Sequence, residues 1–165
     1  MFNSKIQEAL NEQINHEFYS SYLYLSMSAY FETLSLQGFA HWMRLQSTEE
    51  QVHAIKLFDF INDRNGRVVL TAIEQPPAKF QSPLDVFQQA LKHEQQVTEL
   101  IDELYKLAAT DKDYAIQVAL QWFIEEQVQE EKQIRQIVDE LKRAGDESVA
   151  LFILDRELGV RAVDN

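Results

Sequence analysis

Four long stretches of the chain repeat apolar residues at helical spacing, and the links between them differ greatly in length. The pattern predicts helices over residues 5–33, 38–65, 83–109 and 113–143. The first and last links are short, so the helices on either side of each should be antiparallel neighbours. The middle link, GRVVLTAIEQPPAKFQSP, is long enough to return along a bundle and make the second and third helices parallel. The sequence therefore predicts an all-α four-helix bundle with one long crossover.

The few glycines and prolines agree with long helices. The whole chain contains only 4 Gly and 3 Pro. Gly66 is a plausible C-terminal cap of the second helix, and Asp111 or Asp113 could cap the start of the fourth. A fifth, short helix is expected in DESVALFILDREL, where it either covers the bundle end or packs on other subunits. Its apolar residues include Val149, Phe152 and Ile153. We expect residues 1–165 to form one domain.

Charge and residue usage narrow the classes of protein to which the chain can belong. It has 15 Lys and Arg against 27 Asp and Glu, a net charge of −12. Such a surface repels nucleic acid and anionic membranes, and it attracts cations. The sequence has no cysteine, which excludes disulfides and thiolate metal sites. It also lacks a signal-peptide core and any apolar run of spanning length, so we expect a cytoplasmic protein.

Every predicted helix carries a carboxylate near the middle of its apolar stripe. The four residues are Glu17, Glu50, Glu94 and Glu130, and His53 shares a face with Glu50. In a bundle of this kind the helix midpoints meet at one level, so these side chains should converge. Four unpaired buried carboxylates would repel one another, and they must therefore be protonated or surround cations.

The spacing of these residues is repeated in the two halves of the chain. Glu50 follows Glu17 by 33 positions, and Gln127 follows Glu94 by the same 33 positions. His53 and Glu130 each come three residues later. Oxygen and imidazole donors without sulfur favour a dinuclear centre of a redox-active metal such as iron over structural zinc. In the second half Glu130 stands where the first half has His53, so that site should have only oxygen ligands and hold metal less firmly, as suits iron that passes through.

Four segments of the chain resemble the non-haem bacterial ferritins in order and spacing. They are NEQINHEFYSSYLYLSMSAY, STEEQVHAIKLFDF, KHEQQVTELIDEL and LQWFIEEQVQEEKQI. The resemblance covers essentially the whole chain, including the crossover and the fifth helix, and implies the ferritin-like fold. It also implies ferroxidase activity with oxygen or peroxide, and storage of a ferric mineral in a hollow homo-oligomeric cage of two dozen subunits.

The resemblance also implies roles for individual residues. One iron site would be made by Glu17, Glu50 and His53. The other would be made by Glu50, Glu94 and Glu130, with Gln127 beside it and Glu50 bridging the two ions. Tyr24 corresponds to a family tyrosine next to the centre, a candidate electron donor, and Trp122 matches a family aromatic nearby.

A third iron site is found in many such ferritins, and this chain matches it only in part. Glu49, Glu126 and Glu130 correspond to its ligands, but Gln129 stands where a fourth carboxylate is common. We therefore expect weaker iron binding there. Haem is not expected, because the ligating methionine of bacterioferritins is absent: Gln51 and Val52 precede His53.

Several residues also have a simpler interpretation. Tyr24 could be a packing residue, and Glu49 and Glu126 could be solvated surface. Trp122 fits a core position. The three remaining histidines have no partner pattern, and we interpret them as surface or packing residues; they are His16, His41 and His93.

Three other functions are compatible with a helical bundle of this kind. A di-iron oxidase or peroxidase would keep the two metals but need an organic substrate or an electron-donor domain. A DNA-protecting miniferritin would place metal between subunits and often has basic tails. A purely structural bundle would keep its carboxylates protonated, and removing Glu50 or Glu130 would then stabilise it.

Overall fold

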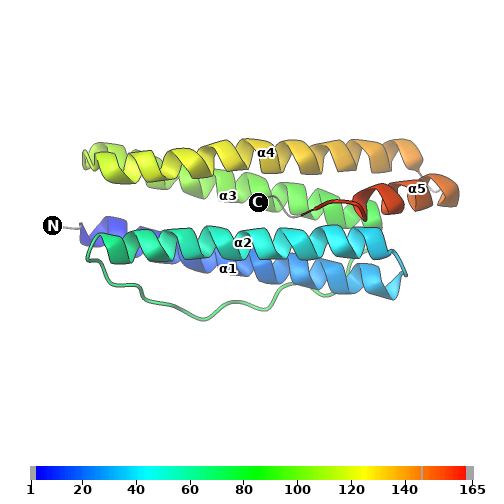
Figure 1. Cartoon of the computed structure of the whole chain (residues 1–165), viewed down its shortest axis with the longest axis horizontal. Helices are drawn as coiled ribbons and strands as arrows, with labels where there is room; N and C mark the ends of the chain where they lie inside the picture. Colours follow the sequence, from blue (N-terminus) through cyan, green and yellow to red (C-terminus); the bar gives the residue numbers. More distant parts are fainter. Residues whose placement is uncertain (1–2, 146, 163–165) are drawn as a thin grey trace.

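The computed structural model describes residues 3–145 and 147–162, and in these ranges the chain forms five α-helices. They are α1 (Ser4–Thr33), α2 (Gln37–Asp63), α3 (Pro83–Thr110), α4 (Tyr114–Ala144) and α5 (Ser148–Leu158). Helices α1 and α2 form one antiparallel pair, and α3 and α4 form the other (Figure 1). The predicted bundle is thus confirmed, with each main helix within two residues of its expected bounds. None of the described helices is long and apolar enough to cross a membrane.

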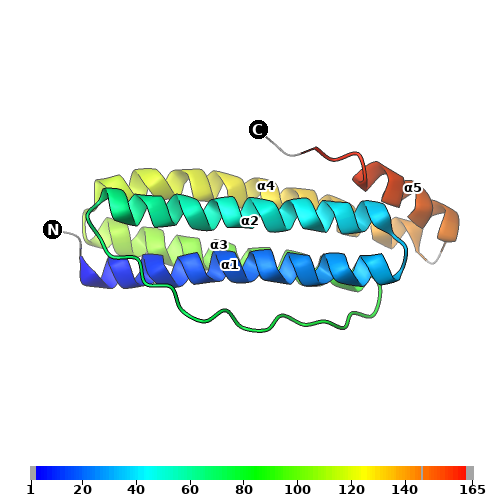
Figure 2. The same ribbon diagram turned by 60° about the horizontal axis from the view of Figure 1, so that its bottom comes forward.

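The crossover between α2 and α3 runs back along the outside of α1, which makes α2 and α3 parallel (Figure 2). This segment has no regular structure, so its backbone needs partners elsewhere. Asn11 Nδ2 donates to Arg67 O at 3.1 Å, and Val69 N donates to Asn11 Oδ1 at 2.9 Å. Further along, Ser26 Oγ donates to Pro77 O at 2.6 Å. Polar side chains on the outer face of α1 therefore hold the crossover in place.

The helix ends are set by local chemistry, which corrects one prediction. Gly66 is not in the left-handed conformation at the end of α2; Asn65 is, with a φ of 54°. Gly66 follows it, and its N–H donates to Ile61 O at 2.9 Å in a Schellman arrangement. Asp113 caps α4 as predicted, because its side chain accepts a hydrogen bond from Ile116 N.

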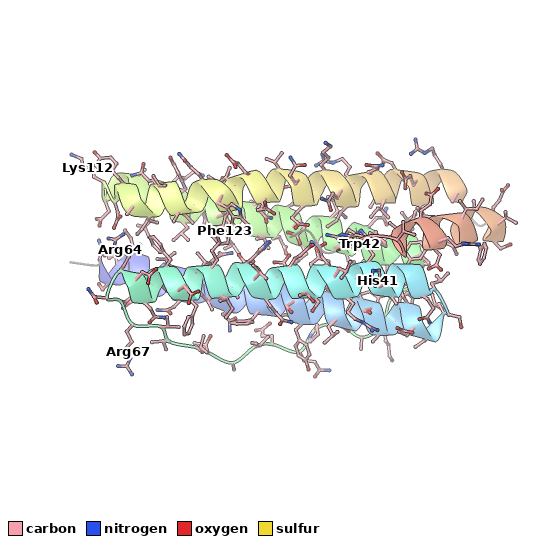
Figure 3. All side chains as sticks on the ribbon, viewed as in Figure 1. His41, Trp42, Arg64, Arg67, Lys112 and Phe123 are labelled. Carbon is pink, nitrogen blue, oxygen red and sulfur yellow. The ribbon has the colours of Figure 1, made fainter. Side chains whose placement is uncertain are left out.

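The buried apolar residues form two clusters, one on each side of a polar layer in the middle of the bundle. One cluster includes Phe31, Phe39 and Phe87, and the other includes Leu10 and Ile101. Phe123 and Trp42 lie between the two helix pairs, whereas Arg67 and Lys112 project outward (Figure 3). The helix midpoints therefore meet at one level, as the sequence predicts.

Helix α5 packs against α2 and α4 at one end of the bundle. Asp155 Oδ1 accepts a hydrogen bond from Phe39 N at 3.0 Å, so α5 caps the N-terminus of α2. The approach is close enough to need glycine: a Cβ on Gly38 would lie 1.6 Å from Asp155 O. Val149, Phe152 and Ile153 stay exposed. The docking of α5 fixes the direction in which the following tail leaves.

Candidate metal centre

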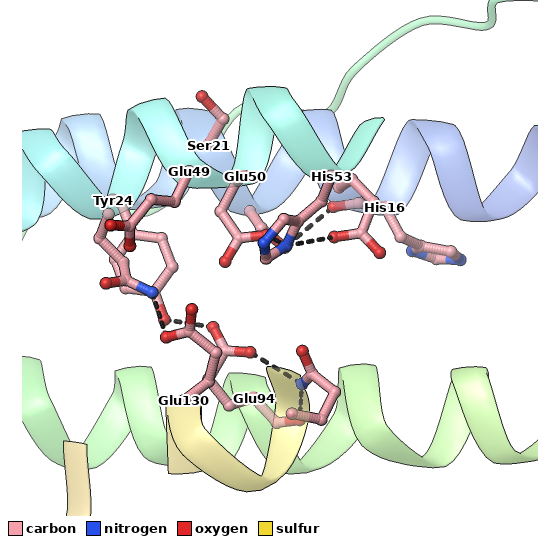
Figure 4. A network of polar contacts seen from close by, with 12 residues as sticks. His16, Ser21, Tyr24, Glu49, Glu50, His53, Glu94 and Glu130 are labelled. Carbon is pink, nitrogen blue, oxygen red and sulfur yellow. Dashed lines mark hydrogen bonds and ion pairs between the residues drawn. The ribbon is translucent and has the colours of Figure 1, made fainter. Parts of the chain in front are cut away.

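The predicted metal ligands of all four long helices meet in the polar layer. Glu17 comes from α1, Glu50 and His53 from α2, Glu94 from α3 and Glu130 from α4. All five residues are buried, and each is at most 5 % exposed. Figure 4 shows Glu50 and His53 pointing from α2 toward Glu94 and Glu130.

The first half of the chain supplies a compact group of three ligands. His53 Nδ1 lies 3.2 Å from Glu50 Oε2 and 3.8 Å from Glu17 Oε2. One ligand atom from each of the three residues lies within 4.8 Å of the other two. Gln13 Nε2 donates to Glu17 Oε1 at 2.8 Å and so orients that carboxylate. The arrangement suits one metal ion.

Two buried oxygens of this group have no hydrogen-bond partner in the part of the chain that the structure describes. They are Glu17 Oε2 and Glu50 Oε1. Buried polar atoms in native proteins are almost always paired, since leaving one unpaired costs roughly 1–3 kcal/mol. Both oxygens belong to the two carboxylates that flank His53 Nδ1 in the three-residue group. A bound cation would satisfy both at once.

The second half of the chain holds its carboxylates by hydrogen bonds. The Tyr24 hydroxyl donates to Glu94 Oε1, and Gln127 Nε2 donates to Glu94 Oε2 at 3.0 Å. Glu130 Oε2 accepts a hydrogen bond from the Gln46 side-chain amide. A second compact group, also within 4.8 Å, comprises His53, Glu126 and Glu130. Among the described residues, Glu94 belongs to neither compact group, and both of its oxygens are occupied by these donors.

The electrostatics of the layer favour a bound cation. Burial raises the pKa of Glu17 and Glu94, and burial together with the other carboxylates raises the pKa of Glu50 well above its ordinary value. Burial and the charge of Glu94 raise the pKa of Glu130 to about 8. Four carboxyl groups in one buried layer cannot all ionise without compensating positive charge. Divalent metal would supply that charge.

The residues of the expected third site lie at the edge of the layer. Glu49 and Glu126 are half-buried and Gln129 is exposed. Glu49 Oε2 accepts a hydrogen bond from Arg161 Nη2 at 2.6 Å. Arg161 could not be predicted from the sequence, because it follows the fifth helix in a segment with no periodic pattern. Its position depends on how α5 docks.

Aromatic and histidine residues around the layer have packing partners. Trp122 meets the His53 ring edge to face at 5.2 Å between centroids, and Lys56 Nζ lies 3.6 Å from the Trp122 ring centre. His93 Nε2 lies 2.7 Å from Ser20 Oγ, and burial lowers the pKa of His93 to about 4. Burial and the nearby carboxylates raise the pKa of Tyr24 well above its ordinary value, so its hydroxyl keeps its proton.

Comparison with known proteins places this geometry in a family. The family model of the ferritin-like domain matches residues 7–144 of the chain. The chain belongs to the ferritin family. A "Bacterial non-heme ferritin" of Bacteroides fragilis is 46% identical to this ferritin over 161 residues, which cover 98% of this chain and 100% of that one. The protein of the same name from Staphylococcus saprophyticus is 42% identical over 164 residues, which cover 99% and 98%.

Solved structures of ferritins superimpose closely on this one. The open pore ferritin of the hyperthermophilic archaeon Archaeoglobus fulgidus gives a TM-score of 0.98 at 48% identity, covering 98% of this chain and 100% of that one. A humanized archaeal ferritin gives 0.99 at 45% identity, covering 100% of both chains. Non-haem ferritins store iron and are ferroxidases, so membership of the family supports both activities for this ferritin.

Proposed function

We propose that this ferritin oxidises Fe(II) to Fe(III) at a di-iron ferroxidase centre inside each bundle and stores the product as a ferric oxyhydroxide mineral. The oxidant would be oxygen or hydrogen peroxide. Residues 1–165 would act as a single domain, assembled into a cytoplasmic 24-subunit cage. Ferrous iron is the substrate and cargo of the protein.

Glu17, Glu50 and His53 would hold the first ferrous ion. The observation that carries this assignment is the pair of buried oxygens without a hydrogen-bond partner among the described residues, Glu17 Oε2 and Glu50 Oε1, on the two carboxylates that flank His53 Nδ1. Carboxylate and imidazole donors without sulfur suit iron. The His53 ring is held against Trp122, so the imidazole is already oriented toward the ion.

The second ion would be held by Glu50, Glu94 and Glu130, with Gln127 beside it. Glu50 would bridge the two ions and keep them close enough for each to give one electron to the same oxygen molecule. Reaching this geometry requires Glu94 to turn from its donors on Tyr24 and Gln127 toward the metal. The second ion should therefore bind more weakly than the first, which suits iron in transit to the mineral.

Protons must leave the centre as iron enters. The raised pKa values of Glu50 and Glu130 mean that the metal-free site retains protons near neutral pH. Ferrous ions would displace these protons, so iron binding should tighten as the pH rises. Tyr24 donates to Glu94 and would position that ligand, and it is also a candidate electron donor.

Glu49, Glu126 and Glu130 would form the third site, on the way out of the centre. Glu126 and Glu130 belong to one compact group of ligand atoms. Glu130 would then serve both the second and the third site. An ion could pass between them without leaving its carboxylate.

An anaerobic binding experiment tests the ligand assignment. Metal-free protein is equilibrated with Fe(II) without oxygen, and the bound ions per subunit are counted. Two tightly held ions are expected. Glu17→Gln should lose the tighter ion, because it removes one charge from the first site. The exposed Glu125→Gln is the matched control, and equal binding in all three proteins would refute the assignment.

A further inference from the structure

The side chain of Arg161 reaches from the tail after α5 to the edge of the polar layer. Its Nη2 lies 2.6 Å from Glu49 Oε2, and its Nη1 donates to Gln46 Oε1 at 2.8 Å. The guanidinium lies over the Trp42 ring, 4.6 Å from its centre. The side chain is only 15% exposed. A partly buried, two-pronged contact of this kind is stronger than an ordinary surface ion pair.

Gln46 connects this arginine to the centre itself. One end of its amide accepts from Arg161, and the other end donates to Glu130 Oε2. The guanidinium therefore contacts one expected third-site ligand, Glu49, directly and reaches a second, Glu130, through one side chain. A positive charge occupies the edge of the site where the third iron ion would have to bind.

The position of Arg161 is fixed by several contacts of the C-terminal segment. Asp155 caps α2 through Phe39 N, and His41 Nε2 lies 2.9 Å from Arg161 O. Gly159 in turn lies against Gly38, where a Cβ would be 3.3 Å from the Gly38 Cα. The described part of the tail is therefore docked from Gly159 to Arg161, and its arginine is directed at Glu49.

We propose that Arg161 is a positioning residue that gates the third site: its guanidinium holds Glu49 as a resident cation, and iron gains this ligand only by displacing it. The inference rests on the proposed ferroxidase function. It gives a reason for weak iron binding at the third site that is independent of Gln129. Since Arg161 contacts neither Glu17, Glu50 nor His53 in the hydrogen bonds of the described residues, the first site should not depend on it.

A cavity beside Arg161 could receive its guanidinium when iron displaces it from Glu49. Arg161 lines a cavity of about 460 Å³ between α2, α4 and α5. Glu140 and Glu157 also line this cavity. Either carboxylate could pair with the arginine once iron has taken Glu49. The guanidinium would therefore move from Glu49 to another carboxylate and would not be left against an apolar surface.

Calorimetric titration with Zn(II), a redox-inert probe, tests the gate without any oxidation. Arg161→Gln should leave the most tightly bound ion, that of the first site, unchanged and tighten the third about tenfold, the effect of losing one charge-assisted competitor. Arg156→Gln is the matched control, since it removes the same charge from an exposed position on α5. A third-ion affinity within twofold of wild type in Arg161→Gln would overturn the proposal.

A double-mutant cycle with Glu49→Gln separates gating from a general loosening of the tail. If Arg161 acts through Glu49, Arg161→Gln should change third-ion binding less than twofold in the Glu49→Gln background. A tenfold effect that persists there would contradict the proposal. Failure of the wild-type protein to bind the first two ions would instead refute the ferroxidase assignment on which the inference rests.

Discussion

The side-chain amide of Gln127 donates to Glu94 Oε2 at 3.0 Å across the interface between α3 and α4. The equivalent positions of the other helix pair are Glu17 and Glu50, which are both carboxylates and each keep one unpartnered oxygen. The two halves therefore repeat one spacing but solve the problem of buried charge differently. In the first half, a bound cation would have to satisfy the carboxylate oxygens. In the second half, the Gln127 amide already donates to one of them.

Replacing Gln127 by glutamate should make the second half resemble the first. Gln127→Glu removes the donor to Glu94 and adds a carboxylate, so the second Zn(II) ion should bind about tenfold more tightly. The metal-free variant should also be less stable than wild type, because a further carboxyl group is buried. Calorimetry and urea unfolding measure the two effects. Gln121→Glu, at an exposed position of the same helix, should change neither.

Removing either ligand of α2 should abolish fast oxidation. Glu50→Ala deletes the proposed bridge and His53→Ala the proposed imidazole ligand, so each should slow the rapid phase of Fe(II) oxidation at least about 100-fold. Rapid mixing of anaerobic Fe(II)-loaded protein with oxygenated buffer gives the rate. Glu125→Ala serves as an exposed control on α4. Wild-type rates in both ligand variants would overturn the assignment.

The metal-free protein should lose stability as the pH rises. The folded state raises the pKa of Glu130 from an ordinary 4.5 to about 8, and the pKa of Glu50 is also raised. Between these values the folded chain binds protons that the unfolded chain has released, so the free energy of unfolding falls with increasing pH. Urea unfolding with a chelator at pH 5.5 and at pH 8 measures this. Glu130→Gln should flatten the profile, and a free energy that rises over this window would contradict the account.

Tyr24→Phe should separate the positioning of Glu94 from packing. Phenylalanine fills the same space but cannot donate to Glu94 Oε1, so Fe(II) oxidation should slow about tenfold while the fold stays intact. Rapid-mixing kinetics and circular dichroism provide the two readouts. Tyr22→Phe is a matched change at an exposed position of α1. An unchanged rate in Tyr24→Phe would leave Tyr24 as a packing residue only.

The polar layer was predictable because helical periodicity fixes which residues share a face. Glu17, Glu50, His53, Glu94 and Glu130 all interrupt apolar stripes at the same level, and the structure buries all five. Helix bounds followed from the same periodicity, with small errors where Asn65 rather than Gly66 takes the left-handed conformation. The helix bounds and the residues that share a helix face could thus be predicted from the local sequence.

The contacts that tune the layer were not predictable in the same way. Arg161 reaches Glu49 only because α5 docks on α2, and this docking depends on Asp155 and Gly38. The orientation of Glu94 depends on side-chain amide and hydroxyl donors on two other helices. Such contacts join residues far apart in sequence and leave no periodic signal. They emerge only when the packed bundle is available.

Assembly into a cage would explain the exposed apolar residues of α5. Val149, Phe152 and Ile153 are 69%, 59% and 52% exposed in the isolated chain. Neighbouring exposed apolar side chains of this kind are typical of an interaction surface. In a cage these residues would pack against other subunits. The size of the particle and its capacity for iron therefore both test whether the protein stores iron in a cage.

An aerobic titration with Fe(II), taken well beyond two ions per subunit and followed by size-exclusion chromatography of the product, tests that claim most directly. The account predicts iron that stays soluble and elutes with a very large protein particle. Iron uptake that stops near two ions per subunit on a small particle would contradict storage. It would leave the metal centre of Glu17, Glu50 and His53 as that of a di-iron enzyme.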